Sequence, residues 1–379
     1  MAKHAYQTYR NKAKPKRRAL RILGRILGTI LALGLFAFAG LAAFLTVTEY
    51  QPRPQEKLEV SGGATRTPVP EEEFTIMSWN IGYGALSDHT DFFMDGGKSV
   101  LTATPERIEQ NMNDFEAEIS RINPEIVLLQ EVDRDSTRSN HMDQAKELQR
   151  AFPHMVSYYA TNYRTAFVPM GIPPYGKVES GAQTLSAFNI KEATRVALPP
   201  SYTWPLSAVQ LKRCELVTRI PVEGSTHELV LINEHPDAYT DEEGRASQIN
   251  AIRETLEAEV AKGNWVIAGG DWNHRFSNAD NSKYPLLPER TWEPGMIDVS
   301  TFGEGWQFIM DASAPTTRLL TYPVVDENGQ DLGMPIQCYL IDGFIVSENV
   351  KLLSAETLDL KFKASDHNPV VIKVLLEKD

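Results

Sequence analysis

The hydrophobic positions of this chain form short apolar runs separated by stripes of helical period. Six runs rich in β-branched and aromatic residues predict buried strands. They cover residues 74–81, 126–132, 229–233, 265–268, 339–347 and 369–376. After Pro105, apolar residues recur every three or four positions up to Ile122, and a second such stripe runs from Ile249 to Val260. Because a helix with one apolar face must bury that face, the pattern predicts an α/β fold with helices outside the sheets.

A different pattern occupies the N-terminal part of the chain. No charged residue occurs from Ile26 to Thr48, which is long enough for one transmembrane helix. Nine Lys and Arg residues precede Gly28, so the positive-inside rule predicts a cytoplasmic N-terminus and an extracellular remainder. A cleaved signal peptide is the alternative, since Ala37-Phe38-Ala39 has a small-x-small pattern.

These patterns predict four segments. Residues 1–25 form a basic cytoplasmic segment and residues 26–48 a transmembrane helix that contacts the lipid bilayer. Residues 49–73 contain several Pro, Gly and charged residues, which is typical of a flexible linker. Residues 74–379 form the globular domain, which we expect to be catalytic.

Composition narrows the partners of the globular part. Residues 51–379 contain 29 Lys and Arg against 49 Asp and Glu. Such an acidic body has no general attraction for nucleic acid or anionic lipid, although a local basic groove is compatible with it. The two cysteines, Cys214 and Cys338, lack the close spacing of a zinc site, and whether they form a disulfide stays open.

Polar residues follow or end each predicted strand. They are Asn80, Glu131, Asn233 with His235, Asp271 with Asn273, Asp342, and Asp366 with His367. Any one of them could be a capping or turn residue. Together, carboxylates gathered at one sheet edge repel one another unless a cation is present, and oxygen ligands suit Mg²⁺ or Mn²⁺. The set therefore predicts a divalent metal and a phosphate ligand.

Other chemistries lack their sequence signals. No G-x-S-x-G turn of a serine hydrolase occurs. Gly97-Lys98-Ser99 resembles the end of a phosphate-binding loop, but Phe92 stands where that loop needs Gly. Phe92, Phe93 and Met94 lie in a long segment, residues 85–104, and packing is the favoured interpretation over contact with a base or lipid.

The ordered motifs SWNIGYG, LLQEVD, NEHPDA, GGDWN, CYLIDGFIVS and SDHNPVV resemble the endonuclease/exonuclease/phosphatase family, which has the DNase I-like fold. The resemblance covers Phe74 to Leu376 and includes SGAQTLSAF, Arg245, Gln248 and Thr316. It implies a four-layer α/β/β/α sandwich.

The resemblance also implies roles for residues. Glu131 is expected to be the principal ligand of Mg²⁺ or Mn²⁺, with Asn80 and Asp366 close to the ion. Asp271 would orient or deprotonate the attacking water, and Asn273 would hold that water or a phosphate oxygen.

Three further residues complete the expected site. His367, oriented by Asp342, would hydrogen-bond the phosphate. His235 would contact the phosphate or act as a general acid, although the Pro236-Asp237 sequence after it departs from the family pattern.

The sequence therefore predicts a membrane-anchored, metal-dependent phosphoesterase, namely a phosphodiesterase, nuclease or phosphatase, in which water attacks phosphorus in line. Nucleic acid, phospholipid and small phosphodiesters remain open as substrates, and no protein partner is predicted. The alternative is a catalytically weak binding or scaffold protein that retains the fold.

Overall fold

The computed structural model describes residues 2–378, with side chains from residue 18 onward. Helix α1 (Ala2–Val47) belongs to a unit separate from the remainder, which begins at Tyr50. From Arg18 to Val47 this helix is long and apolar enough to cross a membrane, a test that a signal sequence also passes. The side chains of Lys3, Arg10, Lys12, Lys14, Lys16 and Arg17 in the predicted basic segment lie outside the described residues.

Two seven-stranded sheets form the second unit. The first contains, in spatial order, β17 (Val350–Thr357), β18 (Val370–Leu376), β3 (Phe74–Asn80), β4 (Ile126–Asp133), β6 (Gly176–Ser186), β5 (Val156–Val168) and β2 (Val60–Ser61). The second contains β1 (Gln55–Lys57), β7 (Glu192–Ala197), β8 (Cys214–Pro221), β9 (Glu228–Glu234), β10 (Trp265–Asp271), β16 (Asp342–Ser347) and β13 (Trp306–Ile309). The pairs β3–β4 and β9–β10 are parallel, so their carboxyl ends meet at shared edges.

Helices and short elements complete the unit. The α-helices are α2 (Pro105–Ile122), α3 (Gln144–Ala151) and α4 (Glu242–Val260). Two small ribbons pair β11 (His274–Phe276) with β12 (Gly295–Ile297) and β14 (Thr317–Arg318) with β15 (Cys338–Tyr339). Short 3₁₀ helices are η1 (Gly82–Gly84), η2 (Phe93–Asp95), η3 (Thr137–Ser139), η4 (Leu206–Val209) and η5 (Val299–Phe302).

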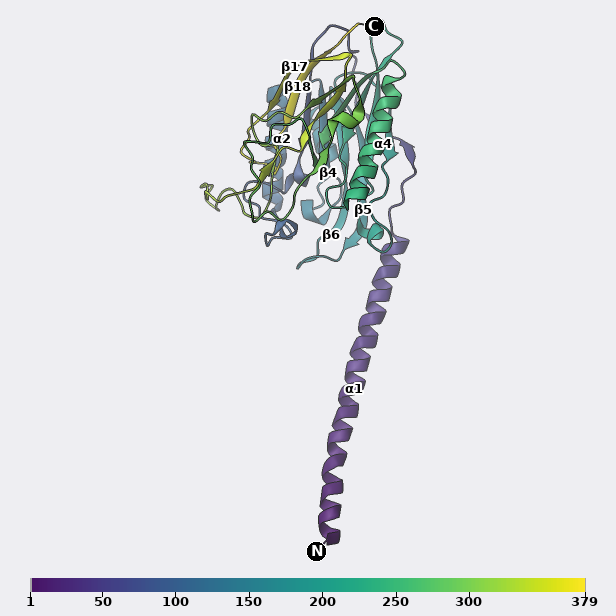
Figure 1. Ribbon diagram of the computed structural model, residues 1–379, viewed down its shortest axis with the longest axis vertical. Helices are drawn as coiled ribbons and strands as arrows, with labels where there is room; N and C mark the ends of the chain where they lie inside the picture. Colours follow the sequence, from purple (N-terminus) through teal and green to yellow (C-terminus); the bar gives the residue numbers. More distant parts are fainter. Residues whose placement is uncertain (1, 379) are drawn as a thin grey trace. The chain divides into compact units, whose positions relative to one another are not determined.

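Three apolar cores separate the layers. Ile76 and Leu128 of the first sheet meet Ile267 and Phe344 of the second in the central core. The outer face of the first sheet packs on α2 and α3, and that of the second sheet packs on α4. Figure 1 shows α2 and α4 on opposite sides of the sheets. The predicted α/β/β/α sandwich is confirmed, and each of the six predicted strands and both predicted helices are present.

Part of the predicted linker, residues 49–73, forms strands. Strand β1 pairs with β7, and β2 pairs with β5, so the segment extends an edge of each sheet. The polar composition of this segment concealed these strands, because an edge strand offers backbone N–H and C=O groups to a partner whatever its side chains are. The two cysteines, Cys214 and Cys338, are free thiols.

Glycines allow the close approach of the strands that carry the polar residues. A Cβ atom on Gly270 would lie 2.0 Å from the carbonyl oxygen of Glu234 in β9. A Cβ on Gly343 would lie 2.3 Å from the carbonyl oxygen of Ile309 in β13. Gly270 and Gly343 are themselves partners in the register of β10 with β16, in which Asp271 lies opposite Asp342.

We predict that Gly270→Ala destabilises the protein by about 1–3 kcal/mol or more, because the added methyl group meets backbone that cannot rotate away. Urea unfolding of the full-length chain in detergent, followed by tryptophan fluorescence, measures the change. Gly63→Ala is the control, since a Cβ there meets nothing within 4 Å. Equal unfolding midpoints for the two variants would contradict the explanation.

Candidate active site

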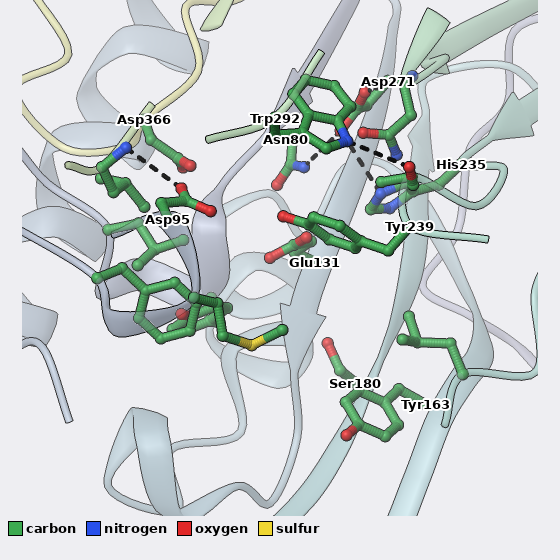
Figure 2. Close-up of a pocket in the computed structure, with 18 of the residues that line it drawn as sticks. Asn80, Asp95, Glu131, Tyr163, Ser180, His235, Tyr239, Asp271, Trp292 and Asp366 are labelled. Atoms are coloured by element: carbon green, nitrogen blue, oxygen red, sulfur yellow. Dashed lines mark hydrogen bonds and ion pairs between the residues drawn. The ribbon is translucent and has the colours of Figure 1, made fainter. Parts of the chain in front are cut away.

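The structure brings the predicted polar residues together in one pocket. Seven of the eight candidate residues line it, namely Asn80, Glu131, His235, Asp271, Asn273, Asp366 and His367. Figure 2 labels five of these residues, namely Asn80, Glu131, His235, Asp271 and Asp366, among the side chains of the pocket. The eighth, Asp342, is buried behind His367 and hydrogen-bonds to it.

Asp271, at the end of β10, has hydrogen bonds to both of its carboxylate oxygens. Its Oδ1 accepts from the backbone N–H of Asn273 at 2.9 Å, and its Oδ2 accepts from Nδ2 of Asn80 at 3.0 Å. Because Asn80 ends β3, the second bond joins the two sheets at the base of the pocket. The Nε2 atoms of His235 and His367 lie 3.5 Å and 3.8 Å from the same Oδ2 atom.

His367 and Asp342 form a buried pair across the two sheets. Nδ1 of His367 lies 2.9 Å from Oδ2 of Asp342. The hydroxyl oxygen of Thr316 accepts from the backbone N–H groups of Ile341 and Asp342, at 2.8 and 3.1 Å, and so fixes the backbone that carries this carboxylate.

Two opposing effects act on His367. Burial alone would lower its pKa, but the carboxylates of Asp342 and Asp271 outweigh burial and raise the pKa of His367 well above its usual value. The imidazole is therefore cationic at neutral pH, and its Nε2 is free to donate to a phosphate oxygen.

His235 has the opposite electrostatic environment. Burial lowers the pKa of His235 to about 3, and the positive charge of Arg213 acts in the same direction. The loop after it is held by two bonds, from Nδ2 of Asn273 to the Pro236 carbonyl at 3.0 Å and from the Asp237 N–H to Gln248 at 2.8 Å. A neutral imidazole favours hydrogen bonding over the general-acid alternative.

Asn233 has a structural role, because its side chain hydrogen-bonds to the first sheet rather than to His235. Its Nδ2 donates to the carbonyl oxygens of Leu129 and Gln183 in the first sheet, both at 3.1 Å. Its Oδ1 accepts from Nε2 of Gln130 at 2.8 Å. Asn233 therefore fixes the end of β9, from which His235 extends, against the opposite sheet.

The donor set of the pocket fits a divalent cation. Glu131 has a φ of 54° at an irregularity in the pairing of β4 with β6, a strained backbone that turns its side chain into the pocket. Burial raises the pKa of Asp366 to about 7, and the negative charge of Glu131 adds to this. Carboxylates so placed ionise together only when a cation compensates them, and oxygen ligands suit a hard ion.

A second grouping of potential ligand atoms lies deeper. One ligand atom from each of Asp271, Asp342 and His367 lies within 4.8 Å of the others. Because Nδ1 of His367 is already paired with Asp342, only Nε2 and the Asp271 carboxylate face the pocket. The geometry is better suited to binding a phosphate and a water than to enclosing an ion.

Several residues of the pocket gave no recognisable sequence signal. Asp95, in the segment 85–104, is buried and accepts from the N–H of Leu320 at 3.2 Å. Arg213 and Tyr239 also line the pocket. Arg213 directly precedes β8, and in the sequence it is only a charged residue next to the start of a strand, which does not mark it as a pocket residue.

The aromatic residues after Asp91 have two roles. Phe92 and Phe93 pack with their ring centroids 5.0 Å apart, and both rings contact Tyr175. Packing, the favoured prediction, is therefore observed. Phe92, Phe93 and Met94 nevertheless also line the pocket, which makes its walls apolar.

Comparison with known proteins identifies the class. The sequence profile described as the Endonuclease/Exonuclease/phosphatase family matches residues 77–367, most of the chain. The chain belongs to this family and is a metal-dependent hydrolase of phosphoester bonds. No curated protein matches the sequence.

Solved structures share the fold at low sequence identity. A family member from Beutenbergia cavernae has a TM-score of 0.53 and 18% identity, covering 81% of this chain and 72% of its own. One from Bacteroides thetaiotaomicron has a TM-score of 0.50 and 16% identity, covering 81% and 99%. One from Bacteroides vulgatus has a TM-score of 0.50 and 14% identity, covering 81% and 100%. At these identities the likeness concerns the fold alone.

Two buried carboxyl groups belong to Glu234, which directly precedes His235 in the chain, and to Glu215 of the adjacent strand β8. Glu234 in β9 and Glu215 in β8 are both fully buried, and both carboxyl oxygens of Glu234 lack a hydrogen-bond donor. Burial raises the pKa of Glu215 to about 8, and burial together with Glu215 raises the pKa of Glu234 well above its usual value. Both groups are therefore protonated in the folded protein at neutral pH.

This pair predicts a loss of stability as the pH rises from about 5 to about 8. The unfolded chain releases these protons near pH 4.3, so the folded state binds more protons up to about pH 8 and stability falls over that interval. Each retained proton contributes a slope of about 1.4 kcal/mol per pH unit. We expect Glu215→Gln to flatten the fall of the urea midpoint between about pH 5 and pH 8.

The matched control is Glu254→Gln on the exposed side of α4, which should keep the slope of the unsubstituted protein. If Glu215→Gln and the unsubstituted protein lost stability in parallel, the buried pair would not be the source.

Proposed function

We propose that this chain hydrolyses a phosphodiester outside the cytoplasm with Mg²⁺ or Mn²⁺, the domain being anchored by residues 26–48. The observation that carries the proposal is the convergence of seven strand-end polar residues in one pocket, with Asp342 behind them. Nucleic acid, phospholipid and small phosphodiesters are the substrate classes.

Each side chain has a proposed role that its contacts support. Asp271 orients and deprotonates the attacking water, since hydrogen bonds from Asn80 and Asn273 hold its carboxylate at the pocket base. His367, kept cationic by Asp342, donates from Nε2 to a phosphate oxygen and stabilises negative charge that develops there.

Two further residues border the phosphate position. His235, neutral in its buried environment, donates a hydrogen bond to the phosphate or the leaving oxygen. Asn273 contacts the water or a phosphate oxygen, although its Nδ2 donates to the Pro236 carbonyl in this structure. That bond makes Asn273 a support for the His235 loop as well.

Asn80, Glu131 and Asp366 are the proposed ligands of the metal. A divalent ion held there supplies positive charge that polarises phosphoryl oxygens and stabilises the leaving oxygen. The three side chains come from β3, from β4 and from the segment before β18, which are neighbours in the first sheet, so one sheet edge positions the whole set.

The proposed location follows from α1. If residues 26–48 span a bilayer with the basic segment 1–25 in the cytoplasm, everything after the helix lies outside. The proposed linker 49–73 and catalytic domain 74–379 then form the extracellular part.

We predict that the full-length protein hydrolyses at least one of three substrate types when Mg²⁺ or Mn²⁺ is present: oligonucleotides, phospholipids and aryl phosphodiesters. Chelation with EDTA should abolish turnover, and adding either ion back should restore it. Asp271→Asn should lower kcat by roughly a thousandfold or more, because the water loses its base, while the Asn side chain keeps one of the two oxygens that accept hydrogen bonds.

Asp280→Asn is the control, since Asp280 is exposed in a loop and bonds only locally to Ser282. No turnover on any of the substrates with either metal would favour the binding or scaffold alternative instead. Full activity in Asp271→Asn would contradict the role proposed for Asp271.

The anchor makes a separate prediction. We expect the protein to stay in the membrane fraction after alkaline carbonate washing and to be digested by protease added to intact spheroplasts. The mass of the purified protein should include residues 1–48. A mature protein that begins after Ala39 would instead identify a cleaved signal peptide.

A further inference from the structure

The buried arginines of the domain differ in whether their guanidinium groups have hydrogen-bond acceptors. Arg138 donates to both carboxylate oxygens of Asp133, at 2.8 and 3.0 Å. Arg195 and Arg318 each donate to two or more backbone carbonyl oxygens. Arg213 is 7% exposed, yet its Nε and Nη1 have no acceptor, and no carboxylate in the described residues forms an ion pair with it.

Arg213 lies in the active-site pocket. Its backbone, directly before β8, is fixed by the N–H of Leu198, which donates to the Arg213 carbonyl oxygen at 3.0 Å. Its side chain lines the same pocket as His235 and Asp271, and its charge acts on the imidazole of His235. Tyr202 and Tyr239 line the pocket too and come under the same charge.

An unpaired buried guanidinium is costly. Burying a charge without a partner costs several kcal/mol, so such a group is retained where a ligand supplies the missing partner. The carboxylates of the pocket do not supply it, since none of them pairs with Arg213. The ligand of Arg213 is therefore an anion that enters from outside the chain.

A guanidinium group donates strong, charge-assisted hydrogen bonds to a phosphate group. In the proposed function, His235, Asn273 and His367 already contact the scissile phosphate. Arg213 is left for another anionic group on the substrate. Arg138 and Arg318 also line the pocket, but both already have acceptors. A single arginine without an acceptor, in an acidic domain with apolar pocket walls, fits one extra phosphate better than a long polyanion, which needs a basic track.

We propose that Arg213 binds a second phosphate group of the substrate, so that the enzyme acts on a small phosphodiester or headgroup that carries a further phosphate. The inference rests on the proposed function for the place of the scissile phosphate. It disfavours substrates with a cationic headgroup, which Arg213 would repel. The second phosphate can belong to a soluble molecule or to a lipid headgroup.

Binding to the full-length protein in detergent tests the proposal independently of turnover. In the Asp271→Asn background with Mg²⁺, calorimetry compares inositol 1-phosphate with inositol 1,4-bisphosphate, and dioctanoyl phosphatidylinositol with its 4-phosphate. We expect the second phosphate to tighten binding about tenfold or more in at least one pair. Adding Arg213→Met should reduce that gain to about onefold, and Arg213→Lys should keep part of it.

The two pairs distinguish the source of the phosphate. A gain with the free inositol pair indicates a soluble substrate, and a gain only with the dioctanoyl pair indicates a lipid headgroup. Arg164→Met, at an exposed position on β5, removes the same charge and should leave the gain unchanged.

Stability separates this role from a structural one. Because Arg213→Met removes an unpaired buried charge, its urea midpoint should equal or exceed that of the parent, whereas loss of a structural arginine lowers it. Equal affinity within both pairs, or equal weakening of both members by Arg213→Met, overturns the proposal. So does Arg213-dependent binding of an oligonucleotide without a gain in either pair. Failure of the proposed function would instead appear as absent turnover in the unsubstituted enzyme.

Discussion

The hydrogen bond between Asp342 and His367 is the interaction on which the arrangement of the pocket depends. Asp342 begins β16 of the second sheet, and His367 directly precedes the return of the chain to the first sheet in β18. The bond therefore fixes the relative positions of the two sheets where their polar ends face each other. A second hydrogen bond between the two sheets joins Asn80 to Asp271, and a third joins Gln130 to Asn233. Each replaces apolar contact between the sheets with a directional one, so a small shift of either sheet would break several bonds together.

Burying these polar groups has an electrostatic cost, and the two halves of the pocket differ in how that cost is offset. On the side of Asp271, the cationic His367 and the hydrogen bonds from Asn80 and Asn273 lower the pKa of the Asp271 carboxyl group despite its burial. On the side of Asp366, burial and the neighbouring Glu131 raise the pKa of the carboxyl group instead. The same residue type is thus ionised in one half of the pocket and lacks a compensating charge in the other. That difference supports the proposed water-activating role of Asp271 and the proposed metal binding by the half that contains Asp366.

Periodicity was sufficient for an α/β fold with helices outside the sheets and for the strand-end residues, whereas the four-layer sandwich followed from the family resemblance. Asn80, Glu131, Asp271 and Asp366 each interrupt or end an apolar run, and parallel strands deliver their ends to one edge. Residues on irregular segments were not predictable in this way. Asp95 enters the pocket through a 3₁₀ turn in the segment 85–104, and Arg213 looks like an ordinary charged residue before a strand. Strands β1 and β2 were hidden in a polar segment because edge pairing depends on backbone groups rather than on side chains.

The two histidines show why position in the pocket matters more than residue type. Both are buried and both lie within 4 Å of the same Asp271 oxygen. Only His367 has a second carboxylate behind it, whereas His235 experiences the positive charge of Arg213. One ring is therefore cationic and the other neutral at the same pH. An anion bound to Arg213 would offset the charge that acts on His235 and make its protonation easier. Occupancy of the Arg213 position would then alter the hydrogen bonding of His235, so a second phosphate would affect catalysis as well as affinity.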